Sequence, residues 1–108
     1  MYLLSRSEEM VLLSIWALQD GAYGVTIREQ LLKMSGYKWS LGAIYAPLHR
    51  LEKKGFVSTL KGEPISERGG RSRIYYQVSE EGTRALLEIK RVHDSIWQNI
   101  PSLKFKKS

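Results

Sequence analysis

Hydrophobic residues recur at helical spacing in four stretches of the chain, and two further stretches are rich in β-branched and aromatic residues. The first helical stretch covers residues 10–18 and follows Ser5 and Glu8, whose spacing is typical of a capping box. Because apolar residues cover most of its circumference, we expect this helix to be buried on more than one side. Asp20-Gly21 should end it.

A short second helix and an amphipathic third helix are expected next. Thr26 and Glu29 repeat the capping-box spacing, and Ser35-Gly36 should end the second helix. Ser40 is a suitable cap for the third helix, which Gly55 should terminate. Pro47 inside it lacks an amide donor, so we expect a local kink or a shortened first half. One face of this helix is apolar and consists of Leu41, Ile44, Leu48 and Leu51.

The second half of the chain predicts a hairpin and a final helix. Residues 56–61 and 73–78 have strand composition, with Gly62, Pro64, Gly69 and Gly70 between them, which indicates a hairpin with a long loop. Ser79 caps a helix with Glu80 and Glu81 in its first turn, and Pro101 should stop it near Ile100. The last residues carry lysines without periodicity and predict a frayed basic tail.

Together these elements predict a mainly α fold with a small β-hairpin, that is, a winged helix-turn-helix with a C-terminal dimerisation helix. With 108 residues and no long linker, a single core is expected. We assign residues 1–78 to a winged-helix DNA-binding domain, 79–101 to the dimerisation helix of the same compact unit, and 102–108 to the basic tail.

Charge is concentrated in the middle of the chain. The formal net charge is +6, divided as −2 over residues 1–20, +6 over 21–78, −1 over 79–98 and +3 over 99–108. An excess of this size could serve solubility alone. Charge that serves solubility alone need not be concentrated in the middle of the chain between two slightly acidic segments. The distribution therefore favours a DNA-facing surface.

On a helical wheel of 100° per residue, the face of the third helix opposite its apolar stripe has small side chains in its first two turns and basic side chains later. This pattern favours close approach to a groove followed by phosphate contacts, although a solvated helix face can have a similar composition. Tyr45 lies at the edge of this face, where its ring can pack on the core margin while its hydroxyl reaches a phosphate. The candidate DNA-binding residues in and before this helix are Lys38, Ser40, Gly42, Ala43, Tyr45, Ala46, His49, Arg50 and Lys53.

The hairpin loop combines two glycines with several guanidinium groups. Such a loop suits phosphates or a narrow minor groove, and we favour this interpretation over a merely solvated turn. The candidate DNA-binding residues of the loop are Arg68, Gly69, Gly70, Arg71 and Arg73.

The final helix has an apolar stripe that is too long for one small domain to cover. We therefore expect it to pack on a partner helix in a twofold homodimer. The candidate interface residues are Leu86, Ile89, Val92, His93, Ile96, Trp97 and Ile100. We favour plain packing at this interface. The alternative is a ligand pocket there, floored by Trp97 or Trp16 and suited to a small aromatic effector.

The residue inventory argues against catalysis, cofactors and metals. The chain has no cysteine, and His49 and His93 lack partners at metal-ligand spacing. The pairs Glu8/Glu9 and Glu80/Glu81 resemble helix-start charges without a nucleophile nearby. No apolar run approaches the roughly 20 residues that span a bilayer, and no secretory signal begins the chain, so we expect a cytoplasmic protein.

Over nearly its whole length the sequence resembles the PadR family of bacterial transcriptional regulators, in its small form with a short C-terminal helix. The residues that carry the resemblance are Tyr23-Gly24, Gly42-Ala43-Ile44-Tyr45, Leu48-His49-Arg50-Leu51-Glu52-Lys53-Lys54-Gly55-Phe56-Val57, Gly69-Gly70-Arg71 and Tyr75-Tyr76-Gln77-Val78-Ser79-Glu80-Glu81-Gly82.

The resemblance implies a groove-reading helix over Ser40 to Lys54, with Tyr45 at the family's tyrosine, and wing glycines at Gly69 and Gly70. It also implies repression of nearby genes and release from DNA when an effector binds. Ala46-Pro47 stands where many members have proline directly after the tyrosine. Because the C-terminal region is a single short helix, any ligand would have to use the dimer interface.

These observations together predict a homodimeric, sequence-specific DNA-binding regulator, an effector-released repressor with a pseudo-palindromic operator. Two alternatives remain. One is a winged-helix module that binds an acidic protein partner through the same basic face. The other is a small-molecule sensor with little affinity for DNA.

Overall fold

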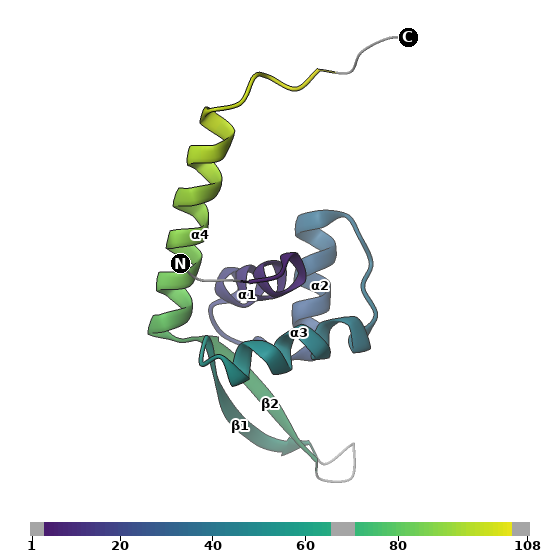
Figure 1. Ribbon diagram of the computed structural model, residues 1–108. Coiled ribbons are helices and arrows are strands. Elements are labelled where there is room, and N and C mark those ends of the chain that lie inside the picture. The colour runs from purple at the N-terminus through teal and green to yellow at the C-terminus, as the bar shows by residue number, and fades with distance from the viewer. Residues whose placement is uncertain (1–3, 66–70, 105–108) are drawn as a thin grey trace.

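The computed structural model describes residues 4–65 and 71–104. Three helices pack together, a two-stranded hairpin extends from one side of them, and a long last helix starts at the base of the hairpin and runs along their flank (Figure 1). The elements are α1 (Arg6–Leu18), α2 (Gly24–Ser35), α3 (Leu41–Lys53), β1 (Val57–Ile65), β2 (Arg71–Val78) and α4 (Glu80–Gln98). This is the winged-helix architecture predicted from the sequence.

Helix α1 begins with the predicted capping box. The Ser5 hydroxyl accepts a hydrogen bond from the Glu8 amide at 3.1 Å, and the Ser5 amide donates to the Glu8 carboxylate at 2.7 Å. One side of α1 is fully buried, but Leu13 and Trp16 are 38% and 48% exposed. The expectation that α1 is buried on more than one side is therefore only partly met within a single chain.

Helix α2 starts earlier than predicted. Thr26 is not its cap, because the helix already begins at Gly24. The Thr26 hydroxyl instead accepts a hydrogen bond from the Tyr23 amide at 2.9 Å and donates to the Gly21 carbonyl at 2.7 Å, which closes the turn between α1 and α2. Gly36 ends α2 in the left-handed conformation, as predicted.

Helix α3 runs from Leu41 to Lys53, so Pro47 does not shorten its first half, which was one of the two expected effects of this proline. The Ser40 hydroxyl caps it by accepting from the Ala43 amide at 3.1 Å. Pro47 is buried on the core face between Ile44 and Leu51. Packing of the pyrrolidine ring offsets the one amide donor that proline removes, so the helix continues through it.

The strands are longer than predicted, and the connection between them is correspondingly shorter. β1 continues through Gly62 and Pro64 to Ile65, which pairs with Arg71. The register shifts between Lys61 and Pro64, which places a β-bulge there. Both strands of a two-stranded sheet are edge strands, so proline and glycine are tolerated where a central strand would exclude them.

The hairpin is attached to the helices at its base. The Tyr76 amide donates to the Ala22 carbonyl at 2.8 Å, and the Ser79 amide donates to the Phe56 carbonyl at 3.0 Å. At the start of α4, a side chain on Gly82 would overlap the Phe56 carbonyl. The core lies between the three helices and this base and consists of Val11, Leu12, Ile15, Ala22, Ile27, Leu31, Ile44, Leu48, Leu51, Phe56, Val57, Tyr76 and Ala85.

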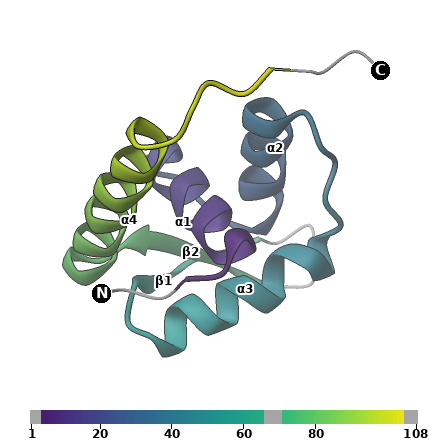
Figure 2. The same cartoon turned by 45° about the horizontal axis from the view of Figure 1, so that its top comes forward.

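Helix α4 is capped by Ser79, as predicted, and ends at Gln98, two residues before the expected end. Its only buried residues, Gly82 and Ala85, lie in its first two turns. The radius of gyration, 16.4 Å, exceeds the roughly 13 Å expected of a compact chain of this length. Figure 2 shows α4 standing beside α1 at the edge of the helical body.

Within residues 4–65 and 71–104, no helix combines the length and apolar character needed to cross a membrane.

Candidate nucleic-acid interface

The outer face of α3 is open to solvent along its whole length. Leu48 and Leu51 point into the core and Leu41 is half-buried, as the sequence pattern predicted. The predicted DNA-binding residues of this region are all exposed, namely Lys38, Ser40, Gly42, Ala43, Tyr45, Ala46, His49, Arg50 and Lys53. The structure therefore brings these residues onto one accessible surface, which we call the α3 face.

The two ends of the α3 face differ in bulk. Gly42, Ala43 and Ala46 project nothing larger than a methyl group in the first half of the helix. His49 and Lys53 follow in the second half, where they provide long polar side chains. A neighbouring molecule can therefore approach the backbone closely near the start of α3 and meet basic groups near its end.

Arg50 is held by a carboxylate of its own chain. Its Nε donates to Glu8 at 3.1 Å, and the Lys54 ammonium donates to both Glu8 oxygens at 3.0 Å. The Glu8 side chain is 3% exposed, whereas those of Arg50 and Lys54 are 48% and 39% exposed. These ion pairs join the end of α3 to the start of α1 and direct the Arg50 side chain toward α1.

The buried carboxylate of Glu8 is held in its charged form. Burial acts to raise its pKa, but hydrogen bonds from the Ser5 amide, Lys54 and Arg50 outweigh burial, and the pKa lies below its ordinary value. Glu8 therefore remains an anion at neutral pH and partly neutralises the basic end of α3.

Tyr45 fixes α3 to the start of α2. A side chain on Gly24 would overlap the Tyr45 hydroxyl, so the phenol ring lies directly on that glycine. The ring is 42% exposed and packs at the core margin, as predicted. Its hydroxyl points to the N-terminus of α2.

Arg73, midway along the hairpin, lies against two tyrosines. Its guanidinium carbon is 4.0 Å from the centroid of the Tyr23 ring, and its Nη1 lies 3.5 Å from the Tyr75 hydroxyl. Arg68, Gly69 and Gly70 lie outside the described residues, as does the side chain of Arg71, whose backbone begins β2.

The apolar stripe of α4 becomes more exposed along the helix. Its first part, Leu86, Ile89 and Val92, is half-buried, while Ile96 and Trp97 are 57% and 50% exposed. His93 and Ile100 are exposed as well. The Trp97 indole N–H donates to the Nε2 atom of His93 at 3.2 Å, one turn earlier on α4.

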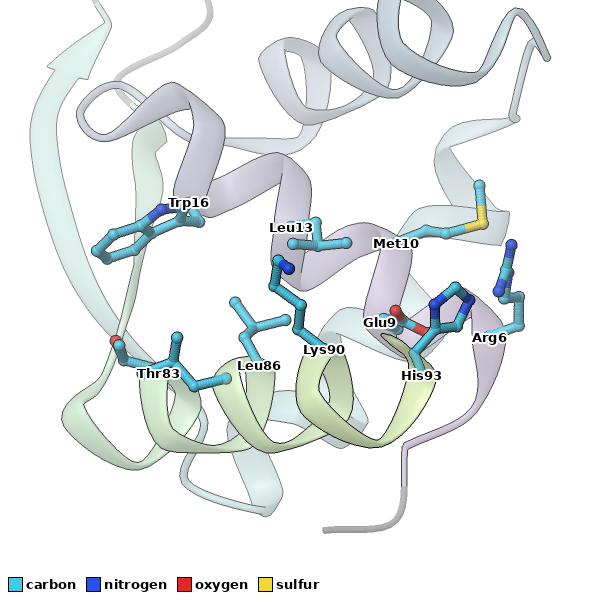
Figure 3. A pocket seen from close by; sticks show the side chains of 10 residues that line it. Arg6, Glu9, Met10, Leu13, Trp16, Thr83, Leu86, Lys90 and His93 are labelled. Atoms are coloured by element: carbon cyan, nitrogen blue, oxygen red, sulfur yellow. The ribbon is translucent and has the colours of Figure 1, made fainter. Parts of the chain in front are cut away.

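A cavity of about 520 Å³ lies between α1 and α4 (Figure 3). Leu13 and Trp16 reach it from α1, and Leu86 and Lys90 face them from α4. Trp16 lines this cavity, which a single chain forms, whereas the pocket considered from the sequence was one at a dimer interface; Trp97 is not among the lining residues. The full lining is Arg6, Glu9, Met10, Leu13, Trp16, Thr83, Leu86, Leu87, Lys90 and His93.

Sequence reasoning missed the roles of Glu8 and Tyr23. Glu8 precedes the buried Val11 and Leu12 by three and four positions, so a helical wheel places its carboxylate on the core face and provides a signal that it needs cationic partners. Nothing local to Tyr23 predicts its contact with Arg73, fifty positions away.

No cluster of three or more histidine, cysteine or acidic residues that could hold a metal ion occurs in the part of the chain that the structure describes.

Comparison with known proteins gives a consistent result. The model of the PadR-like family of transcriptional regulators matches residues 12–88. A PadR-family regulator from Eggerthella lenta is 25% identical, with a TM-score of 0.67 over 82% of this chain and 75% of the other. A PadR-like regulator from Bacillus cereus is also 25% identical, with a TM-score of 0.66 over 84% of each chain.

A third structure, a PadR-family regulator from Clostridium difficile, shares the fold at 20% identity, with a TM-score of 0.69 over 87% of this chain and 93% of the other. No curated protein gives a significant match. The family model covers most of the chain, including all of α2, α3 and the described hairpin. The chain therefore belongs to the PadR-like family of transcriptional regulators.

Proposed function

We propose that this protein is a sequence-specific DNA-binding regulator that acts as a homodimer, with α3 in the major groove and the hairpin on the flanking backbone. The family consists of transcriptional regulators, which are not enzymes. The single observation that carries the proposal is the α3 face. Its first half has the small side chains of Gly42, Ala43 and Ala46, and its second half has the long polar side chains of His49 and Lys53.

The shape of this face suits a groove. A major groove about 12 Å wide accepts a helix, and small side chains at the helix start allow the backbone to approach base edges. Lys38 precedes α3 and Lys53 lies near its end, so that cations flank the small residues on both sides. Arg68 and Arg71 are proposed as the phosphate or minor-groove contacts of the hairpin, on the strength of their sequence pattern alone.

The charge distribution supports the same orientation. Residues 21–78 carry a net charge of +6, whereas residues 79–98 carry −1. Helix α4 also pairs its charges internally, with Arg84 bound to Glu80 and Glu81, Lys90 to Asp94, and Arg91 to Glu88. An anionic polymer is therefore attracted to the α3 side of the molecule rather than to α4.

Dimerisation is proposed to occur through α4. Ile96, Trp97 and Ile100 are large apolar side chains that the single chain leaves exposed. A second copy of the helix, related by a twofold axis, would cover them and present two α3 helices to a pseudo-palindromic site. Sedimentation of the purified protein tests this directly, because a monomer at micromolar concentration would contradict it.

The regulation is proposed to be repression that an effector relieves. The cavity between α1 and α4 supports this part, since its volume of about 520 Å³ falls within the range of ligand pockets and Trp16 provides an aromatic wall. A small planar aromatic compound is the proposed class of effector. Quenching of Trp16 fluorescence in a variant that lacks Trp39 and Trp97 measures binding, and addition of the bound compound should weaken DNA affinity.

Selection from random genomic fragments, followed by a salt titration on the enriched site, tests the proposed function. We expect enrichment of a short inverted repeat and a steep fall of affinity with salt, equivalent to about six or more released counterions. No enrichment would reject sequence-specific binding. A weak salt slope would favour an acidic protein partner instead, and tryptophan quenching without DNA binding would favour a sensor.

A further inference from the structure

The middle of the hairpin and the turn before α2 form a cluster that we call the wing joint, which consists of Tyr23, Gly62, Arg73 and Tyr75. The Tyr23 and Tyr75 rings meet edge to face, with centroids 5.7 Å apart and planes at 76°. The Arg73 guanidinium covers the Tyr23 ring at 4.0 Å and reaches toward the Tyr75 hydroxyl. All three side chains are half-buried.

A β-bulge gives Arg73 its place in this cluster. Ile74 pairs with Lys61 and Ser72 pairs with Pro64, so Arg73 faces the bulge and has no paired residue on β1. Bulges redirect side chains from the regular alternation of a strand. Gly62, in the bulge, lies under the Tyr75 ring, and a side chain there would overlap that ring. The irregular strand therefore brings Tyr75 and Arg73 into position to meet Tyr23.

Tyr23 belongs to the turn that also supports α3. The Tyr45 side chain of α3 packs on Gly24, the residue after Tyr23. Ala22, the residue before Tyr23, accepts the backbone hydrogen bond from Tyr76 of β2. The wing joint thus connects the hairpin to the same short segment against which α3 packs. We therefore expect changes in this cluster to affect how the hairpin is held relative to α3.

We propose that Arg73 is a positioning residue, which fixes the hairpin relative to α3 through Tyr23, and that it does not contact DNA phosphate. Only the part of this inference that concerns DNA phosphate rests on the proposed function. The guanidinium is directed onto the turn before α2, where the Tyr23 ring covers one of its faces and Nη1 lies 3.5 Å from the Tyr75 hydroxyl. Contacts within the protein therefore account for its position. The phosphate contacts of the hairpin then belong to other residues.

The first test uses the free protein and does not depend on DNA. Amide hydrogen exchange is measured for β1 and β2 in Arg73→Gln, Tyr23→Leu and the double variant, with Tyr23→Phe as the control that keeps the ring. We expect each single variant to exchange about three- to fivefold faster in the hairpin, as removal of an exposed cation–π interaction predicts, with the helices unchanged. The double variant should exchange little faster than Tyr23→Leu, because that change already removes the cation–π interaction together with the ring contact to Tyr75.

The second test is a salt titration on the selected DNA site. Arg73→Gln and Tyr23→Leu should lower affinity by similar factors and leave the salt slope unchanged, although only one of them removes a charge. Arg91→Gln on α4 is the control for removal of a cation elsewhere. If Arg73 binds phosphate, Arg73→Gln will instead reduce the slope by roughly 0.9 for each phosphate that is no longer neutralised.

Several outcomes would overturn the inference: unchanged exchange in the hairpin of Arg73→Gln, additive effects in the double variant, or a reduced salt slope. Should Tyr23→Leu unfold α2, Arg73→Gln with Tyr23→Phe still decides the matter, because only the former removes the cation from the ring. Absence of DNA binding by the wild-type protein would reject the proposed function, while the exchange measurements would still test the positioning role.

Discussion

The winged-helix part of the molecule and helix α4 are stabilised in different ways. From α1 to β2 every element contributes to one core, and polar links such as Glu8 to Arg50 join elements far apart in the chain. Helix α4 buries only Gly82 and Ala85 and leaves Ile96 and Trp97 exposed. The difference shows that the first part is stabilised by a core shared among its elements, whereas the distal part of α4 buries little apolar surface within one chain.

The largest expected effect is on the core of the winged-helix part. Leu51 is fully buried, so Leu51→Ala should lower the free energy of unfolding by about 2–5 kcal/mol, because burial is reduced and a cavity remains. Urea denaturation measures the change. Leu87→Ala on α4, where the side chain is exposed, is the control, and an equal destabilisation there would break the distinction between the two parts.

Gly82→Ala tests the point where the two parts join. A methyl group at this position would overlap the Phe56 carbonyl, so α4 must shift away from the hairpin base. We expect the free energy of unfolding to fall by about 1–3 kcal/mol, as for other overpacked sites. Gly42→Ala, where the added methyl group would meet only the Ser40 hydroxyl at an ordinary contact distance, should cost nothing measurable by thermal unfolding.

Glu8→Gln tests the link between α1 and α3. Because Glu8 has a lowered pKa, its contribution to stability is present above its unfolded value of about 4.5 and is lost as pH falls through the lower folded value. The variant should be less stable at pH 7 by about 1–3 kcal/mol, as expected when a buried charge-assisted network loses a charge. Its free energy of unfolding should also change less between pH 5 and pH 2 than that of the wild type. An equal change in the two proteins would contradict a stabilising role of the Glu8 charge.

The smallest effect on the single chain is expected in the distal part of α4. Trp97→Ala should leave the unfolding free energy of the dilute protein within about 0.5 kcal/mol of the wild type, because the side chain is half-exposed. The same variant should weaken self-association in sedimentation experiments. Association equal to that of the wild type would remove Trp97 from the proposed interface.

Local signals predicted the helices well. Ser5, Ser40 and Ser79 act as caps because their hydroxyls lie three positions before the amides from which they accept hydrogen bonds. The same logic failed at Thr26, whose hydroxyl bonds the Tyr23 amide and so marks the third residue of α2 rather than its cap. The spacing alone does not distinguish the two positions.

Features that depend on distant contacts were not predicted. Gly62 and Pro64 indicate a loop by composition, yet β1 continues through both, with Gly62 in the bulge and Pro64 paired with Ser72. The wing joint requires a bulge on β1, a ring on β2 and a turn before α2, and no local pattern specifies their meeting. The candidate DNA-binding residues of α3 were predicted to share one exposed surface, but the contacts of Arg50 and Arg73 became evident only in the structure.

A salt titration with two matched charge-removal variants tests the central claim most directly, namely that the α3 face binds DNA and α4 does not. Lys53→Gln removes a cation from α3, and Lys90→Gln removes one from α4. On the selected DNA site, we expect a salt slope reduced by roughly 0.9 per phosphate left without its cation for Lys53→Gln, and a wild-type slope for Lys90→Gln. Equal slopes in both variants, or a change only in Lys90→Gln, would contradict the claim.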